Sequence, residues 1–150
     1  VAALDLPVPY SPTLEEAITH CHLIPFQPCD NDFIVEHVAR HSLRPIDGGW
    51  TWKFDPAVFE RVSLKPMNDY LADTHCRVAV LRGELSDVVP PETGQYMYEL
   101  LSRNAPIIEI PQAYHHLILD QPLAFVAALR AVLADWEHSL PRRPSMQKPQ

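Results

Sequence analysis

The chain has 150 residues, of which 47% are hydrophobic and 21% are charged, a balance typical of one soluble globular domain. The formal net charge of −7 argues against nucleic acid as a partner. The sequence has no run of about 18 apolar residues, the length that would predict a membrane-spanning helix. The three cysteines are odd in number and scattered, which argues against a disulfide framework, so we expect a reducing, cytoplasmic compartment.

The first residues predict a strand followed by a helix. The apolar run VAALD, residues 1–5, favours a strand. Prolines then interrupt regular structure. Thr13 and Glu16 have the spacing of a capping box, in which the threonine hydroxyl accepts from the amide three residues later. This spacing predicts a helix over 14–21.

The next stretch is predicted to be helical and rich in loops. A second helix is expected to begin after Asn31 or Asp32, with apolar residues along one stripe. The segment RPIDGGWTWKFDP, residues 44–56, is interpreted as a loop because its glycine pair is free to adopt positive φ. Short helices are expected over 56–61 and 66–74. Since no strand is predicted within 10–75, this stretch is interpreted as a helical insertion over the sheet.

The pattern changes in the second half of the chain. RVAVLRG (77–83) and PIIEIP (106–111) predict buried strands, and an apolar helical face over 92–102 lies between them. A final helix follows, with Asp120 placed to cap it. Parallel strands need such crossover helices, so the order strand, helix, strand, helix predicts an α/β fold with a parallel sheet.

Polar residues follow each predicted strand at the point where it ends. Asp5 ends the first strand, residues 83–87 end the second, and His115 and His116 follow the third. Ligands in open α/β sheets bind at the carboxyl ends of strands. An acid after one strand and a histidine after the next suits a general base and its orienting carboxylate.

Three segments of the chain resemble the C-terminal half of α/β-hydrolase-fold proteins. They are GGWTWKFDP (48–56), VAVLRGELSD (78–87) and AYHHLILDQPLAFVAALRAVLADW (113–136). The resemblance implies a hydrolase, most often of small carboxylic esters, that uses a serine–histidine–acid triad and no metal or organic cofactor. It also implies that His115 is the catalytic histidine.

The resemblance further implies a division of the chain. It assigns residues 1–9 to the end of a core strand and a linker, 10–75 to a helical lid, 76–140 to the C-terminal part of the core, and 141–150 to a disordered tail.

The histidine loop departs from the family pattern at one position. A glycine usually precedes the family's histidine, whereas Tyr114 precedes His115 here. Because a tyrosine stands at this position, His116 is a second candidate for the functional histidine.

The acid loop departs from the pattern as well. The family's common spacing is a glycine, two residues and then an aspartate, but the third residue after Gly83 is Ser86. Some family members have the dipeptide Ser-Asp in this loop, so Asp87 is the predicted acid. Glu84 is a second candidate, and Asp5 is a third because some members carry the acid after the sixth strand.

The sequence contains no Gly-x-Ser-x-Gly, the pattern of the sharp turn that presents the nucleophilic serine. We therefore expect the nucleophile and the oxyanion hole to lie upstream, in a longer chain of which these residues are a part. The alternative is a non-catalytic binding or regulatory protein that keeps the fold. An upstream Gly-x-Ser-x-Gly would favour the enzyme.

Several histidines and cysteines of the first half raise the question of a zinc site. They are His20, Cys21, His22, Cys29, His37 and His41. The last two histidines are four residues apart on one predicted helix face, which suits two zinc ligands. The overall spacing fits no compact zinc module, so we expect no metal.

Overall fold

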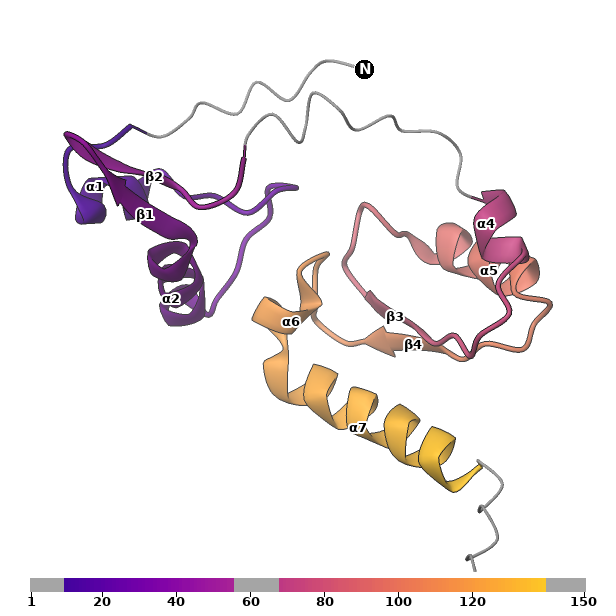
Figure 1. Cartoon of the computed structure of the whole chain (residues 1–150). Helices are drawn as coiled ribbons and strands as arrows, with labels where there is room; N and C mark the ends of the chain where they lie inside the picture. The colour runs from indigo at the N-terminus through magenta and orange to yellow at the C-terminus, as the bar shows by residue number, and fades with distance from the viewer. Residues whose placement is uncertain (1–9, 56–67, 140–150) are drawn as a thin grey trace, which may run out of the picture.

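The computed structural model of the chain describes residues 10–55 and 68–139. The predicted strand over 1–5, the predicted helix over 56–61 and the tail over 141–150 lie outside the described residues. The described elements form two groups along the chain, one within residues 10–55 and one within residues 68–139 (Figure 1).

The first group begins with two short helices, both predicted from the sequence. α1 (Leu14–Thr19) starts as its capping pattern predicts, because the Thr13 hydroxyl accepts from the Glu16 amide at 3.2 Å. α2 (Asp32–Ser42) follows Asn31. The helices contact each other, and each buries one alanine, Ala17 and Ala39.

A β-hairpin follows α2, so the prediction of a strand-free loop was wrong. β1 (Leu43–Ile46) and β2 (Gly49–Trp52) pair antiparallel. Only Asp47 and Gly48 join them, and Gly48 has φ 86°, which suits a tight Asp-Gly turn. Pro45 lies within the first strand. The proline is tolerated because it lies on an edge strand: β2 turns its other edge to Ser11.

The second group contains a parallel strand pair with a helical crossover, as predicted. β3 (Val80–Gly83) pairs with β4 (Ile107–Ile110) from Val80 opposite Ile107 to Gly83 opposite Ile110. The described helices of this group are α4 (Asn68–Ala72), the crossover α5 (Pro91–Leu100), α6 (Leu117–Asp120) and the long α7 (Pro122–His138). Contacts join α4 to α5 and α7 to β4. The α/β prediction is therefore confirmed.

The cap of the final helix differs from the prediction. Gln121 is the N-cap residue of α7 and makes no side-chain cap bond, while Asp120 ends the separate helix α6. The Asp120 carboxylate instead accepts from the backbone amide of Tyr114 and from the side chain of Gln27. The aspartate therefore joins parts of the fold that local sequence spacing could not reveal.

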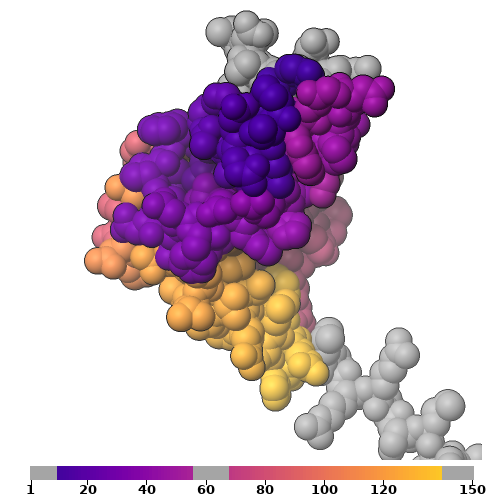
Figure 2. All heavy atoms as spheres, turned by 90° about the vertical axis from the view of Figure 1, so that its left-hand side faces the viewer, coloured from indigo at the N-terminus to yellow at the C-terminus, as the bar shows by residue number. Residues whose placement is uncertain are grey.

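The two groups of elements meet where β4 leads into α7. Gln27 and Asn31, from the loop before α2, donate hydrogen bonds to Asp120. In the space-filling view of Figure 2, the indigo-to-magenta atoms of residues 10–55 lie against the orange and yellow atoms of this region.

The described residues bury few large apolar side chains. The buried apolar residues are Ala17, Ala39, Leu43, Ala105, Ile110 and Ala113. On α7, Leu123 is 84% exposed, and Val126 and Leu133 are about half exposed. Among the described helices, none is both long and apolar enough to cross a membrane.

We expect the isolated 150-residue chain to be poorly stable or to self-associate, because much apolar surface on α7 stays in water and no other described strand covers the edges of the parallel pair. Circular dichroism during heating, combined with sedimentation, measures this. A sharp cooperative transition of a monomer would contradict the expectation.

Candidate active site

Two loops lie side by side at the carboxyl end of the parallel strand pair. The acid loop, residues 84–90, follows β3, and the histidine loop, residues 111–116, follows β4. The Glu84 amide donates to the Ile110 carbonyl at 3.0 Å, and the Leu85 amide donates to the Ala113 carbonyl at 2.9 Å. The backbone pairing of the strands therefore continues into the loops.

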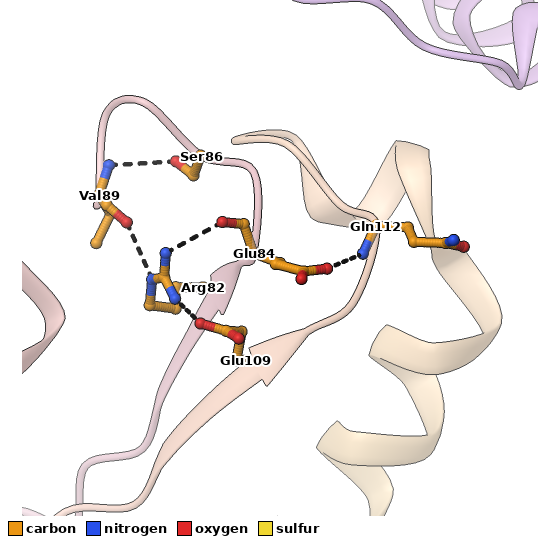
Figure 3. Close-up of polar contacts among 6 residues, drawn as sticks. All are labelled: Arg82, Glu84, Ser86, Val89, Glu109 and Gln112. Atoms are coloured by element: carbon orange, nitrogen blue, oxygen red, sulfur yellow. Dashed lines mark hydrogen bonds and ion pairs between the residues drawn. The ribbon is translucent and has the colours of Figure 1, made fainter. Parts of the chain in front are cut away.

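The Glu84 side chain fixes the turn of the histidine loop. Its carboxylate accepts from the backbone amide of Gln112 at 2.8 Å (Figure 3). Gln112 has φ 56°, a left-handed conformation that costs energy for a residue other than glycine. Because the carboxylate satisfies the amide of this strained residue, Glu84 has a structural role in the acid loop.

Gly83 permits the close approach of the two loops. A Cβ at this position would overlap the backbone carbonyl oxygens of Tyr114 and Ala113. Backbone atoms cannot move aside as a flexible side chain can. The histidine loop can therefore pass this close to the end of β3 only because residue 83 is a glycine.

A buried arginine holds the acid loop from the other side. Arg82 is 4% exposed and forms an ion pair with Glu109 on the neighbouring strand. Its guanidinium also donates to the carbonyls of Val89 at 3.0 Å and Glu84 at 3.4 Å (Figure 3). A buried cation is tolerated only when it is paired and hydrogen-bonded, so these contacts tie both ends of the loop to the strands.

His115 contacts the acid loop through Ser86. The Ser86 hydroxyl lies 3.4 Å from Nδ1 of His115, and it also accepts from the Val89 amide at 3.2 Å. Ser86 is 4% exposed. A hydroxyl at this nitrogen can orient the imidazole and leave Nε2 for proton transfer.

Ser86 is a candidate functional residue that the sequence patterns did not predict. Ser86 is the third residue after Gly83, where the family resemblance led us to expect an aspartate. That spacing was the sequence feature that could have identified it.

Neither of the two described candidate acids, Asp87 and Glu84, forms a hydrogen bond with His115. Asp87 is exposed, and within the described residues it forms no hydrogen bond or ion pair with the histidine. Glu84 is engaged by Gln112, and Asp5 lies outside the described residues. The acid therefore stays a prediction.

His116 packs against its neighbour but faces different partners. The two imidazole rings are 5.5 Å apart and nearly perpendicular. The His116 amide donates to the side chain of Gln27 at 2.8 Å, and its ring atom Nε2 is buried without a hydrogen-bond partner among the described residues. Between the two histidines, His115 is the one that contacts the acid loop.

A small cavity of about 370 Å³ lies behind the histidine loop, lined in part by Cys29, Tyr114 and Asp120. Burial raises the pKa of the Cys29 thiol, and the nearby Asp120 carboxylate raises it further by hydrogen bonding and charge. The thiol is therefore less reactive at neutral pH than an ordinary cysteine.

The described residues contain no group of three or more histidine, cysteine or acidic side chains that could hold a metal ion. The rings of His37 and His41 do lie close together, with centroids 4.3 Å apart and planes tilted by 58°. Two further candidate ligands have local contacts: Nδ1 of His20 lies 3.3 Å from the Ser11 hydroxyl, and Cys21 donates to the Ala17 carbonyl.

Comparison with solved structures relates the fold of this chain to proteins named as hydrolases. E-2-(acetamidomethylene)succinate hydrolase superposes with a TM-score of 0.74 at 17% identity, over 85% of this chain and 47% of that chain. The thioesterase domain from the curacin biosynthetic pathway gives a TM-score of 0.60 at 20% identity, over 86% and 44% of the two chains. An esterase of M. tuberculosis gives 0.62 at 20% identity, over 88% and 45%.

These likenesses show that the chain has part of an α/β-hydrolase fold. The chain spans a little under half the length of each of the three proteins. Neither a protein-family model nor a curated protein sequence matches it.

We expect Gly83→Ala to displace the histidine loop and to destabilise the complete natural protein that carries this sequence by about 1–3 kcal/mol, because the new methyl group meets backbone oxygens. Thermal unfolding measures the loss. Gly94→Ala in α5 is the comparison: its new methyl group would meet a side-chain atom of Arg82 at 3.2 Å and no backbone oxygen, and alanine favours helix, so we expect a smaller loss. Equal stability of both variants would contradict the steric explanation.

We expect Cys29 to react several-fold more slowly with iodoacetamide at pH 8 than in an Asp120→Asn variant. Removing the negative charge lowers the raised pKa of the thiol and so increases the thiolate fraction. Mass spectrometry of the labelled peptides gives both rates, with Cys76 as the exposed internal reference. Unchanged labelling of Cys29 would mean that the carboxylate does not act on the thiol.

Proposed function

We propose that this chain supplies the histidine-bearing part of a hydrolase that acts on small carboxylic esters by a serine–histidine–acid mechanism. The observation that carries the proposal is the position of His115, beside the acid loop at the carboxyl end of the parallel strands. The hydrolase, thioesterase and esterase names of the similar structures support it.

In the proposed reaction, His115 is the general base. The hydroxyl of Ser86 holds Nδ1, so Nε2 can take the proton from a nucleophilic serine and later deliver it to the leaving group. Water then releases the acyl group with the help of the same imidazole. We place the nucleophile and the oxyanion-hole amides in a part of the natural protein outside this chain, because no serine here lies in a Gly-x-Ser-x-Gly turn.

Three carboxylates can complete the proposed triad. Asp87 is adjacent on the acid loop to Ser86, whose hydroxyl lies 3.4 Å from Nδ1 of His115. Asp5 is the candidate from the strand predicted over residues 1–5. Glu84 is the weakest of the three, since its carboxylate already accepts from Gln112.

We further propose that the segment before the parallel strands acts as the lid of the enzyme. Its described part, residues 10–55, lies against the region between β4 and α7 (Figure 2) and contributes Gln27 to the surroundings of the histidines. A lid at this position would shape the pocket for a small substrate and exclude water from it.

The second candidate is a non-catalytic binding protein that keeps the fold. The exposure of Asp87 and its lack of a hydrogen bond to His115 among the described residues favour this alternative. The two functions differ in whether ester turnover depends on the histidine.

The decisive experiment compares His115→Ala with His116→Ala in the complete natural protein, with p-nitrophenyl esters of increasing acyl length as substrates. We expect His115→Ala to lower kcat/KM by about 10³-fold or more, because it removes the general base, and His116→Ala to lower it less than about tenfold. Full turnover by His115→Ala would overturn the proposal.

Single amide substitutions then identify the acid, since the amide keeps the size of each side chain. The variants are Asp5→Asn, Glu84→Gln and Asp87→Asn. We expect Asp87→Asn to reduce kcat by about 10²-fold or more while the other two retain most of it. A large loss confined to Asp5→Asn would transfer the role to the earlier strand.

A further inference from the structure

Both neighbours of His115 donate their backbone amides to one linked network. The Tyr114 amide donates to the Asp120 carboxylate at 2.8 Å, and the His116 amide donates to the Gln27 side-chain oxygen at 2.8 Å. The Gln27 nitrogen donates in turn to both oxygens of Asp120, at 2.9 Å each. The backbone on either side of the histidine is therefore held through a single pair of side chains.

This network crosses between parts of the chain that are far apart in sequence. Gln27 lies in the loop between α1 and α2, whereas Asp120 ends α6. Asn31 strengthens the junction, because its side-chain nitrogen donates to the carbonyls of Leu119 at 2.8 Å and Asp120 at 2.9 Å. These contacts join the two groups of elements, whose atoms lie against each other in Figure 2.

Gln27 uses both the oxygen and the nitrogen of its side-chain amide. Its oxygen accepts from a backbone N–H, and its nitrogen donates to a carboxylate. A glutamate would keep the acceptor but would bring a second carboxylate against Asp120. The two residues are partly buried, where such like-charge repulsion is weakly screened.

We propose that Gln27 is a positioning residue for His115: it joins the segment before the strands to the backbone on both sides of the proposed general base. The inference rests on the proposed function. When Gln27 is in place, the histidine loop is fixed between Ser86 on one side and the Gln27–Asp120 pair on the other. Without the Gln27 side chain, the His116 amide would lose its acceptor and Asp120 would lose one of its donors.

The test exchanges the functional groups of the pair. Gln27→Glu should lower kcat for p-nitrophenyl esters by about 10- to 100-fold, with KM within about threefold, since the change misplaces the base without removing a substrate contact. In the double variant with Asp120→Asn, the new carboxylate can accept from both the His116 amide and the new asparagine nitrogen. The asparagine oxygen can still accept from Tyr114. We expect the double variant to recover kcat to within about fivefold of the wild type.

Gln95→Glu is the matched control in the same complete natural protein. Gln95 also donates to a carboxylate, Glu99 at 2.8 Å, but on the exposed face of α5. The same chemical change there should leave kcat unchanged. Amide hydrogen exchange of Tyr114 and His116 gives an independent measurement: it should accelerate in Gln27→Glu and slow again in the double variant.

The outcomes separate this inference from the proposed function. If His115→Ala abolishes turnover while Gln27→Glu retains full kcat, the positioning role is wrong and the hydrolase proposal stands. Failure of the double variant to recover kcat and amide protection would also overturn the role, even where Gln27→Glu alone folds poorly. If His115→Ala retains turnover, the proposed function fails, and the positioning role fails with it.

Discussion

The parallel pairing of β3 with β4 is the constraint on which the candidate site depends. Because both strands run in the same direction, their loops leave the sheet at one edge, and the lack of a side chain at Gly83 lets these loops approach closely. Arg82 and Glu84 then hold the loops with charged hydrogen bonds. The contact between Ser86 and His115 is a consequence of this backbone geometry.

The sequence could predict the elements whose determinants are local. The capping residue Thr13 and the apolar runs of the two parallel strands each carry their information within a few residues, and the structure confirms these elements. The hairpin was missed because the pair Gly48 and Gly49 was interpreted as part of a loop, although an Asp-Gly pair between two short runs is typical of a hairpin turn. The pairing of the second strand with Ser11 is a contact that no local pattern displays.

In the candidate site too, local sequence patterns predict some residues, whereas the roles of others depend on contacts between distant parts of the chain. His115 could be found from its place after a strand and from the motif around it. The roles of Asp120 and Gln27 could not, since their hydrogen bonds join residues 93 positions apart. Local spacing pointed to a helix cap at Asp120, but its carboxylate is used by tertiary contacts. Polar side chains that link distant loops are identified only once the chain is folded.

The proline in β1 has a consequence for how copies of this chain can meet. The hairpin has one free edge in the described residues, and Pro45 removes a backbone donor from the strand that forms it. An incoming strand would find an interrupted ladder there, which is a common protection against edge-to-edge pairing. Any β-type aggregation would therefore start at the parallel pair, where β3 and β4 carry no proline.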